Sequence, residues 1–192
     1  MKKIPFCKYH ANGNDFIIIS SQNLDVQSHN IPLISRLCNR HLGIGADGLI
    51  IVSPSEKYDF YIDYYNADGN WETFCANGSR CAVRFMYNQG LVGANTVFGA
   101  GDGEHRAKIL KDGYVLMSMK SPEYKSDNIS PEGVAGFFVD SGARHFVCES
   151  KIMDDDYVFK VGKKVRNSNL FQPHGINVNF YHQIKDDCIE IK

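Results

Sequence analysis

Runs of β-branched and aromatic residues, bounded by turn residues, mark strands in the first half of the chain. The strands are predicted over residues 16–20, 48–52 and 59–65. Residues 31–40 carry apolar side chains at helical spacing, with Pro32 near the first turn, and this pattern predicts a helix. A second helix is predicted to begin after Cys75 and to end at residues 88–90, where an Asn-Gln-Gly sequence stops it.

The second half repeats this mixture, so the fold class is predicted to be α+β. Its strands are predicted over residues 114–119, 136–140, 145–148 and 176–180. In the first half, turns are predicted at residues 69–70 and 99–103. Residues 120–132 are rich in Ser, Pro, Lys and Asp, which favours a crossing between two domains. The expected division is 1–119 for an N-terminal lobe and 120–192 for a partial C-terminal lobe.

Charge and composition exclude several classes of partner. The chain has 192 residues, with 21 Lys plus Arg against 22 Asp plus Glu and a formal net charge of −1, so no positive field attracts nucleic acid or an anionic membrane. The basic run at 160–166 is interpreted as a solvated turn. The N-terminus lacks the apolar run of a signal peptide, and 6 scattered cysteines suit reduced thiols, so the cytoplasm is predicted. No metal-ligand spacing is visible, and no metal is predicted.

The segment Phe-Cys-Ala-Asn-Gly-Ser-Arg-Cys at 74–81 places the thiol of Cys75 at a turn that opens a helix. A helix N-terminus carries unpaired N–H groups and a partial positive charge, so it binds a carboxylate and lowers the pKa of a nearby thiol. Cys75 is therefore a candidate acid/base group. The alternative is a small buried residue that packs under the turn. Cys81 is expected to face the interior.

Three ordered blocks carry a family resemblance. Residues 8–16 resemble a K-x-H-G-x-G-N-D-F motif, and residues 39–48 resemble N-R-H-x-G-I-G-x-D-G. Residues 65–69, followed by the Cys75 turn, are similar to F-N-A-D-G and C-G-N-G-x-R-C. These are motifs of the diaminopimelate epimerases. Residues 141–145 and 171–180 resemble the later G-N-P-H and F-P-x-G-x-N-V-x-F motifs, so the likeness runs along almost the whole chain.

The resemblance implies a fold of two similar lobes, each a mixed sheet wrapped around a central helix, with the site in the cleft between them. It implies stereoinversion at the α-carbon of LL- or meso-diaminopimelate, a step of lysine and cell-wall precursor biosynthesis. Two thiols, one on each face of the substrate, would exchange the α-proton without pyridoxal phosphate or another cofactor. The partner implied is a small amino-acid substrate, and a homodimer is suggested.

The same resemblance assigns the site residues. Cys75 would be one base, and the backbone N–H groups of the next three residues would cradle the substrate carboxylate. Side-chain amides would bind the polar ends of the substrate, and two histidines are expected either to orient groups near the thiols or to fill structural positions. The cradle is Ala76, Asn77 and Gly78, the amides are Asn14, Asn66 and Asn177, and the histidines are His10 and His145. Asp15 and Asp47 are expected to cap backbone N–H groups.

Departures from the family pattern leave other readings open. Ala76 replaces a glycine of the cradle, and Ala143 with Arg144 replaces an Asn-Pro pair. The chain stops before the motif that carries the second cysteine, so the second lobe is expected to be incomplete and the chain alone is not expected to invert its substrate. Cys188 is a weak alternative for the second base, because it lies in a strand-like run. A racemase for proline, hydroxyproline or histidine and a non-catalytic, ligand-binding remnant are the other candidates.

Overall fold

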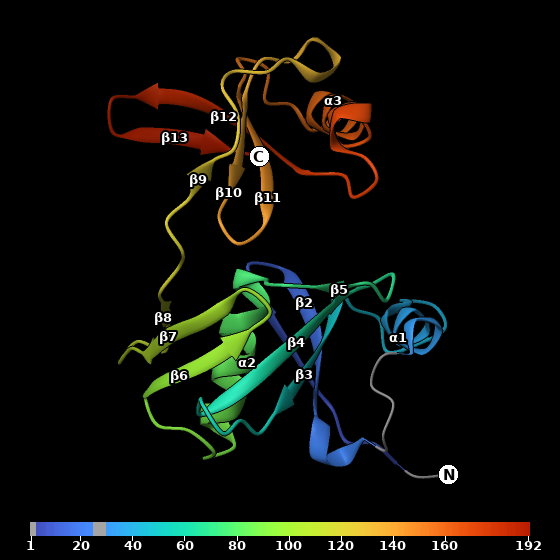
Figure 1. Ribbon diagram of the computed structural model, residues 1–192, viewed down its shortest axis with the longest axis vertical. Helices are drawn as coiled ribbons and strands as arrows, with labels where there is room; N and C mark the ends of the chain where they lie inside the picture. Colours follow the sequence, from blue (N-terminus) through green and yellow to red (C-terminus); the bar gives the residue numbers. More distant parts are fainter. Residues whose placement is uncertain (1–2, 25–29) are drawn as a thin grey trace. The chain divides into compact units, whose positions relative to one another are not determined.

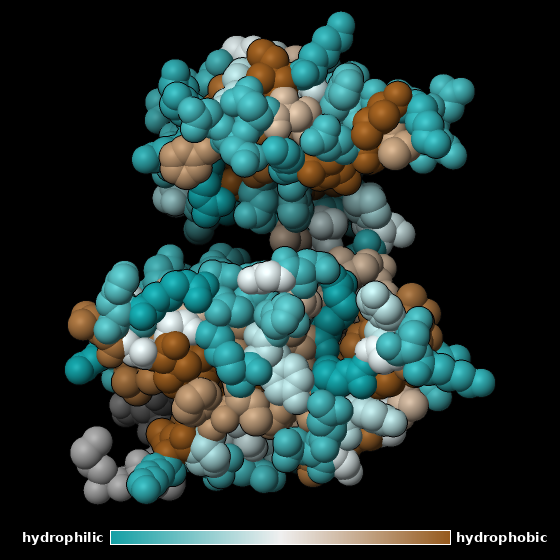
Figure 2. Space-filling model, turned by 180° about the vertical axis from the view of Figure 1, so that it is seen from behind, coloured by the Kyte–Doolittle hydropathy of each residue, from teal (hydrophilic) through white to brown (hydrophobic). Residues whose placement is uncertain are grey.

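The computed structural model describes residues 3–24 and 30–192, and the chain folds into two compact units, Met1–Met119 and Lys120–Lys192 (Figure 1). Each unit has its own sheet and its own hydrophobic core. In the described residues no helix has the length and apolar character needed to cross a membrane. Hydrophilic side chains cover most of the surface seen in Figure 2, and the hydrophobic ones lie in small groups.

Within the described residues, the first unit contains an eight-stranded mixed sheet in the order β1-β2-β3-β4-β6-β7-β8, with β5 paired to β4. The pairs β2–β3 and β4–β6 are parallel and the others are antiparallel. The strands are β1 (Cys7–Ala11), β2 (Asn14–Ser20), β3 (Gly48–Ser53), β4 (Phe60–Asn66), β5 (Trp71–Glu72), β6 (Asn95–Ala100), β7 (Gly103–Ile109) and β8 (Val115–Met117).

Two helices cover opposite faces of this sheet. Helix α2 (Ala76–Asn88) packs on the face that carries Phe16 and Ile50, whereas α1 (Ile31–Cys38) packs on the face that carries Ile17 and Leu49. Strands β2 and β3 are therefore buried on both faces, and their sequences read as continuous apolar runs instead of alternating ones. This continuity is what made both strands visible in the sequence.

In the part of the chain that the structure describes, the second unit contains a five-stranded sheet in the order β13-β12-β11-β10-β9. Its helix α3 (Asp155–Arg166) connects the parallel strands β11 and β12 and packs on β12. The strands are β9 (Glu123–Tyr124), β10 (Phe137–Asp140), β11 (Arg144–Glu149), β12 (Asn177–Lys185) and β13 (Cys188–Ile191). Short 3₁₀ turns lie at η1 (Ser21–Asn23), η2 (Pro131–Gly133) and η3 (Asn169–Phe171).

The interpretation of residues 160–166 as a solvated turn is wrong, because they form the last two turns of α3. Val161 and Val165 face the core of the second unit at helical spacing, and the basic side chains between them lie outside it. The cations also suit the negative end of the helix dipole, and the Asp154 carboxylate caps the other end by accepting the Tyr157 N–H at 2.9 Å.

The predicted turn at 99–103 is also too long. Gly99 and Ala100 belong to β6 and Gly103 begins β7, so only residues 101–102 make the turn. Strand β6 has a glycine at position 99 because a neighbouring side chain lies against its backbone there. A Cβ at this position would meet the Tyr58 ring at 2.5 Å. The predicted α+β architecture of two lobes is confirmed.

Candidate active site at the start of helix α2

Cys75 is the N-cap residue of α2. Its backbone is extended, with φ −141° and ψ 113°, and its carbonyl oxygen accepts the Ser79 N–H at 2.8 Å, which starts the helix. The thiol sulfur accepts the backbone N–H of Gly78 at 3.4 Å. The sulfur thus occupies the place that a Ser, Thr, Asp or Asn oxygen usually takes at a helix start. A reactive atom is fixed at the positive end of the helix dipole as a result.

Burial raises the pKa of the Cys75 thiol above its ordinary value, while the N–H groups of Gly78 and Asn77 and the charge of Arg80 lower it. Desolvation is the largest of these effects. The prediction that the helix end pulls this pKa down is therefore wrong for the net effect. The helix acts in the predicted direction, but withdrawal of the sulfur from water outweighs it.

The other cysteines divide into two groups. Burial raises the pKa of the thiols of Cys38, Cys81 and Cys148 to about 11, so these three are chemically inert at neutral pH. The expectation that Cys81 faces the interior is confirmed, since it is 3% exposed. Cys7 and Cys188 are half-buried, and Cys188 lies at the start of β13 in the second unit.

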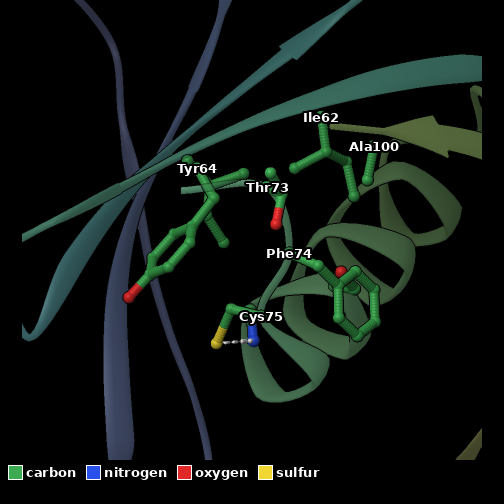
Figure 3. A pocket seen from close by; sticks show the side chains of 9 residues that line it. Ile62, Tyr64, Thr73, Phe74, Cys75 and Ala100 are labelled. Atoms are coloured by element: carbon green, nitrogen blue, oxygen red, sulfur yellow. Dashed lines mark hydrogen bonds between the residues drawn. The ribbon is translucent and has the colours of Figure 1, made fainter. Parts of the chain in front are cut away.

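A narrow pocket adjoins Cys75 (Figure 3). In this view the Cys75 sulfur points toward the side on which the Tyr64 hydroxyl lies, and the Phe74 ring points the other way. The residues that line the pocket come from β3, β4, β6, α2 and the segment before α2: Ile50, Ile62, Tyr64, Thr73, Phe74, Cys75, Gly78, Ser79 and Ala100. The pocket therefore has an apolar floor, with the thiol and the phenol as its most acidic groups.

Tyr64 is a site residue that sequence reasoning missed. Its hydroxyl donates to Asn66 Oδ1 at 2.6 Å, and burial raises the pKa of the phenol well above its usual range. Gly48 leaves room for the ring, because a Cβ there would lie 2.7 Å from Tyr64 Cε2 and 2.6 Å from the Tyr65 carbonyl oxygen. The alternation of β4 was the available signal, since it places Tyr64 on the same face as the buried Ile62, toward α2.

The structure brings Asn14, a predicted substrate-binding amide, together with the side chain of Asn77, a residue of the predicted carboxylate cradle. Asn77 Nδ2 donates to Asn14 Oδ1 at 3.4 Å, Arg80 donates to Asn77 Oδ1 at 2.8 Å, and Asn14 Nδ2 donates to Asp47 at 3.0 Å. Asn66, another predicted amide, instead accepts a hydrogen bond from the Tyr64 hydroxyl. The amides of Asn14 and Asn77 thus form one network beside the first turn of α2. Their contact with a substrate stays a prediction.

The remaining predicted residues are His10 in the first unit and His145 and Asn177 in the second. His10 is exposed on β1 and lines a different, shallow pocket with Lys8 and Asp15. His145 and Asn177 belong to the second unit, where their Cα atoms are register partners on β11 and β12. The His145 ring hydrogen-bonds Asn179 through Nδ1 at 2.7 Å, and Asn177 is exposed. Substrate binding by Asn177 and an orienting role for either histidine stay predictions.

Asp15 and Asp47 link the starts of the parallel strands β2 and β3, next to Asn14. The carboxylate of each accepts the backbone N–H of the other, at 3.0 and 3.1 Å, which confirms the capping role expected for both. Arg40 bridges the two, 2.7 Å from Asp15 Oδ1 and 2.8 Å from Asp47 Oδ1, and Lys8 pairs with Asp15 at 2.9 Å. The hydrogen bond from Arg40 is the main cause that lowers the pKa of Asp15.

Replacement of Asp15 by asparagine tests this link. Because the folded-state pKa of Asp15 is lowered, its charge stabilises the fold above the pKa of an unfolded aspartate, and this contribution is lost as pH falls through the folded-state value. We expect Asp15→Asn to unfold at lower urea concentration than the parent at pH 7, and the difference to narrow in increasingly acidic buffer. A difference that grows on acidification would contradict the assignment.

A buried pair supports the segment that leads into Cys75. His105 is 2% exposed, its Nε2 is 2.8 Å from Asp102 Oδ1, and its Nδ1 is 3.2 Å from the Ser118 carbonyl oxygen. The Phe74 ring stacks on the His105 ring with centroids 4.4 Å apart. The Trp71 ring also lies against this hairpin. A Cβ at Gly101, in the turn between β6 and β7, would be 2.6 Å from the ring. The turn before Cys75 is thus held by the hairpin of β6 and β7.

The fold of this chain is similar to the fold of solved racemases and epimerases. It superimposes on a probable proline racemase from Agrobacterium radiobacter K84 with a TM-score of 0.75 and 13% identity, covering 98% of this chain and 69% of that one. A hydroxyproline epimerase from Agrobacterium vitis gives a TM-score of 0.70 at 10% identity, covering 97% and 68%. At these identities the likeness defines the fold alone.

Sequence comparison gives the family. A family model for diaminopimelate epimerase matches residues 6–125. A diaminopimelate epimerase from Flavobacterium psychrophilum is 39% identical over 185 residues, covering 96% of this chain and 70% of that protein. One from Aquifex aeolicus is 33% identical over 200 residues, covering 97% and 72%. The chain belongs to the diaminopimelate epimerase family, as its sequence motifs predicted.

Proposed function

We propose that this protein is an epimerase that acts on diaminopimelate, with Cys75 as an acid/base group at the α-carbon. The observation that carries the proposal is the Cys75 sulfur at the start of α2, with the N–H groups of Gly78 and Asn77 directed at it. This turn lies inside the segment that matches the family model. The family is named for the substrate, diaminopimelate.

The chemistry follows from the properties of the site. An α-proton of an amino acid is weakly acidic, so its removal needs a base within hydrogen-bond reach and donors that stabilise the developing negative charge. The Cys75 thiolate would take the proton. The first-turn N–H groups of α2, at Ala76 to Gly78, would bind the substrate carboxylate, helped by the helix dipole and by the nearby Arg80. A carboxylate bound there would compete with the sulfur for these same N–H groups.

The raised pKa of Cys75 fits this role. The resting thiol is protonated at neutral pH, so it is ready to donate a proton to one face of the substrate carbanion. Once ionised, a thiolate withdrawn from water is a stronger base than one in solution. Asn14 and Asn77 would orient the polar ends of a substrate, and the hydrogen bond between them beside the same helix turn supports this part of the proposal.

Diaminopimelate is favoured over proline, hydroxyproline or histidine. The relatives of 33 to 39% identity carry the diaminopimelate epimerase name, whereas the proline-type structures share 10 to 13% identity. Independence from pyridoxal phosphate, a place in lysine biosynthesis, a location in the cytoplasm and a homodimer belong to the same proposal. Among the described residues, no group of three or more His, Cys, Asp or Glu side chains is arranged to hold a metal ion.

Hydrogen exchange tests the proposed substrate directly. The chain is incubated in deuterated water with LL- or meso-diaminopimelate, and NMR follows loss of the α-proton signal and formation of the other stereoisomer. We expect exchange at the α-carbon of diaminopimelate, and slower or no exchange with proline, hydroxyproline and histidine under the same conditions. Faster exchange with one of these three would overturn the substrate assignment in favour of a racemase of the same fold.

A further inference from the structure

Tyr64 faces Cys75 across the narrow pocket and has no part in the chemistry described so far (Figure 3). Its hydroxyl donates to Asn66 Oδ1 at 2.6 Å, and the Gly48 backbone lies against one edge of its ring. The Cys75 sulfur points toward the side on which the Tyr64 hydroxyl lies, and interaction with this hydroxyl is a minor cause that lowers the pKa of Cys75. The phenol thus has two acceptors within reach, an amide oxygen and a sulfur.

A phenol has one proton and donates it to one acceptor at a time. While Cys75 is a neutral thiol, its sulfur is a weak acceptor, and the Tyr64 proton lies on the Asn66 side, as the 2.6 Å bond shows. When the thiol ionises, the sulfur becomes a charged acceptor, and hydrogen bonds to charged groups are about twice as strong as neutral ones. Burial keeps the Tyr64 phenol protonated throughout, since it raises the pKa of that group.

We propose that Tyr64 is a positioning residue for Cys75, whose hydroxyl donates to Asn66 Oδ1 when the thiol is protonated and to the sulfur when it is ionised. The inference rests on the proposed acid/base role of Cys75. Only the Cys75 S–H bond breaks, and its proton passes to water in the free protein or to the substrate carbanion during the proposed reaction. The Tyr64 O–H bond stays intact and rotates between its two acceptors.

The rotation has a consequence for Asn66. Once the Tyr64 proton turns to the sulfur, Asn66 Oδ1 loses a donor and becomes available to accept a hydrogen bond from the ammonium group of an amino acid. Asn66 Nδ2 lies 3.3 Å from Glu72 Oε1, which holds the amide in this orientation. Ionisation of the base and exposure of a substrate-binding oxygen are therefore coupled through one hydroxyl group.

The pH dependence of Cys75 alkylation by iodoacetamide, read by peptide mapping, tests the proposal without a substrate. Its midpoint reports the ionisation of the thiol, and its plateau reports access of the reagent. Tyr64→Phe keeps the ring and removes the donor, so we expect its midpoint to rise by about one pH unit, a tenfold loss of thiolate below the midpoint. Asn66→Ala removes the competing acceptor, so its midpoint should fall.

Tyr61→Phe is the matched control, because Tyr61 lies on the same strand and its side chain does not line the pocket. Its midpoint should equal that of the parent. The other ionisable groups near the pair are unchanged in all three variants: Arg80 and Cys81 on α2, Glu72 on β5, Asp47 before β3, and Cys38 at the end of α1.

A Tyr64→Phe midpoint at the parent value, or an Asn66→Ala midpoint that stays or rises, overturns the proposal. Circular dichroism of each variant shows that it is folded. Because alkylation needs no amino acid, a failure of hydrogen exchange with diaminopimelate would reject the proposed function and leave this result standing. A parent-like Tyr64→Phe midpoint together with normal exchange would reject the role of Tyr64 alone.

Discussion

Replacement of Cys75 by alanine should reduce α-proton exchange on diaminopimelate by about 10³-fold, the range in which a positioned acid/base group contributes. The variant also loses the helix cap that the sulfur provides to the Gly78 N–H, at a cost of about 1 kcal/mol in the free energy of unfolding. The loss of exchange is therefore expected to exceed by far any effect of the lost cap. NMR in deuterated water measures the first quantity, and urea denaturation measures the second.

Cys75→Ser separates the two roles. A serine hydroxyl caps a helix well but ionises far less readily than a thiol, so this variant should keep the parent's stability and still lose the exchange. Cys188→Ser is the matched control, a half-buried cysteine in the second unit for which a role as second base was the weaker alternative. Its exchange rate should equal that of the parent. Retention of exchange in Cys75→Ser would show that the sulfur is not the base.

Asp102→Ala should destabilise the fold by about 3 kcal/mol, because removal of one partner from a buried polar pair leaves the other group without its hydrogen bond. The side chains of Asp102 and His105 are 7% and 2% exposed, so water cannot replace the lost partner without opening the core. Since Phe74 stacks on His105, the segment before Cys75 should loosen as well. Chemical denaturation measures the free energy, and hydrogen exchange of the Phe74 and Cys75 amides reports the loosening.

Glu104→Ala is the control for this substitution. Glu104 lies on the same hairpin and pairs with Arg106 at 3.4 Å, but both side chains are largely exposed, at 44% and 76%. The free energy of unfolding of this variant should stay within about 0.5 kcal/mol of the parent. Asp102→Asn, which keeps an acceptor oxygen, should fall between the two. Equal losses in Asp102→Ala and Glu104→Ala would contradict a specific role for the buried pair.

Elements with one strong local signal could be predicted from the sequence. Strands β2 and β3 are apolar on both faces, and α2 follows a turn whose residues match a family motif. Strand β6 and helix α3 could not be predicted in the same way. Gly99 suggested a turn in β6, but it is a glycine because the Tyr58 ring lies against the strand backbone at this position. The basic residues that suggested a turn in α3 lie on its solvent side. In both cases the correct interpretation of the sequence depends on residues that become neighbours only in the folded chain.

In the candidate site, too, the residue with a local sequence signal could be predicted and the effects of tertiary neighbours could not. Cys75 was identified because its chemistry depends on local sequence, a thiol at a helix start. The sign of its pKa shift was wrong because burial depends on β3 and β4, which are distant in the sequence and pack beside the thiol. Tyr64 was missed for a related reason: an aromatic residue in a strand predicts packing, and only the fold places its hydroxyl near a sulfur.

The distribution of sulfur in the fold also determines how this chain tolerates oxidation. All 6 cysteines are free thiols in the folded chain, and the pKa values near 11 of Cys38, Cys81 and Cys148 withhold half of them from oxidants. Unfolding exposes all of them, and six thiols allow 15 complete pairings, none of which exists in the folded state. Air oxidation therefore traps unfolded molecules as cross-linked species, so recovery from denaturant depends on the reductant as much as on the stability of the fold.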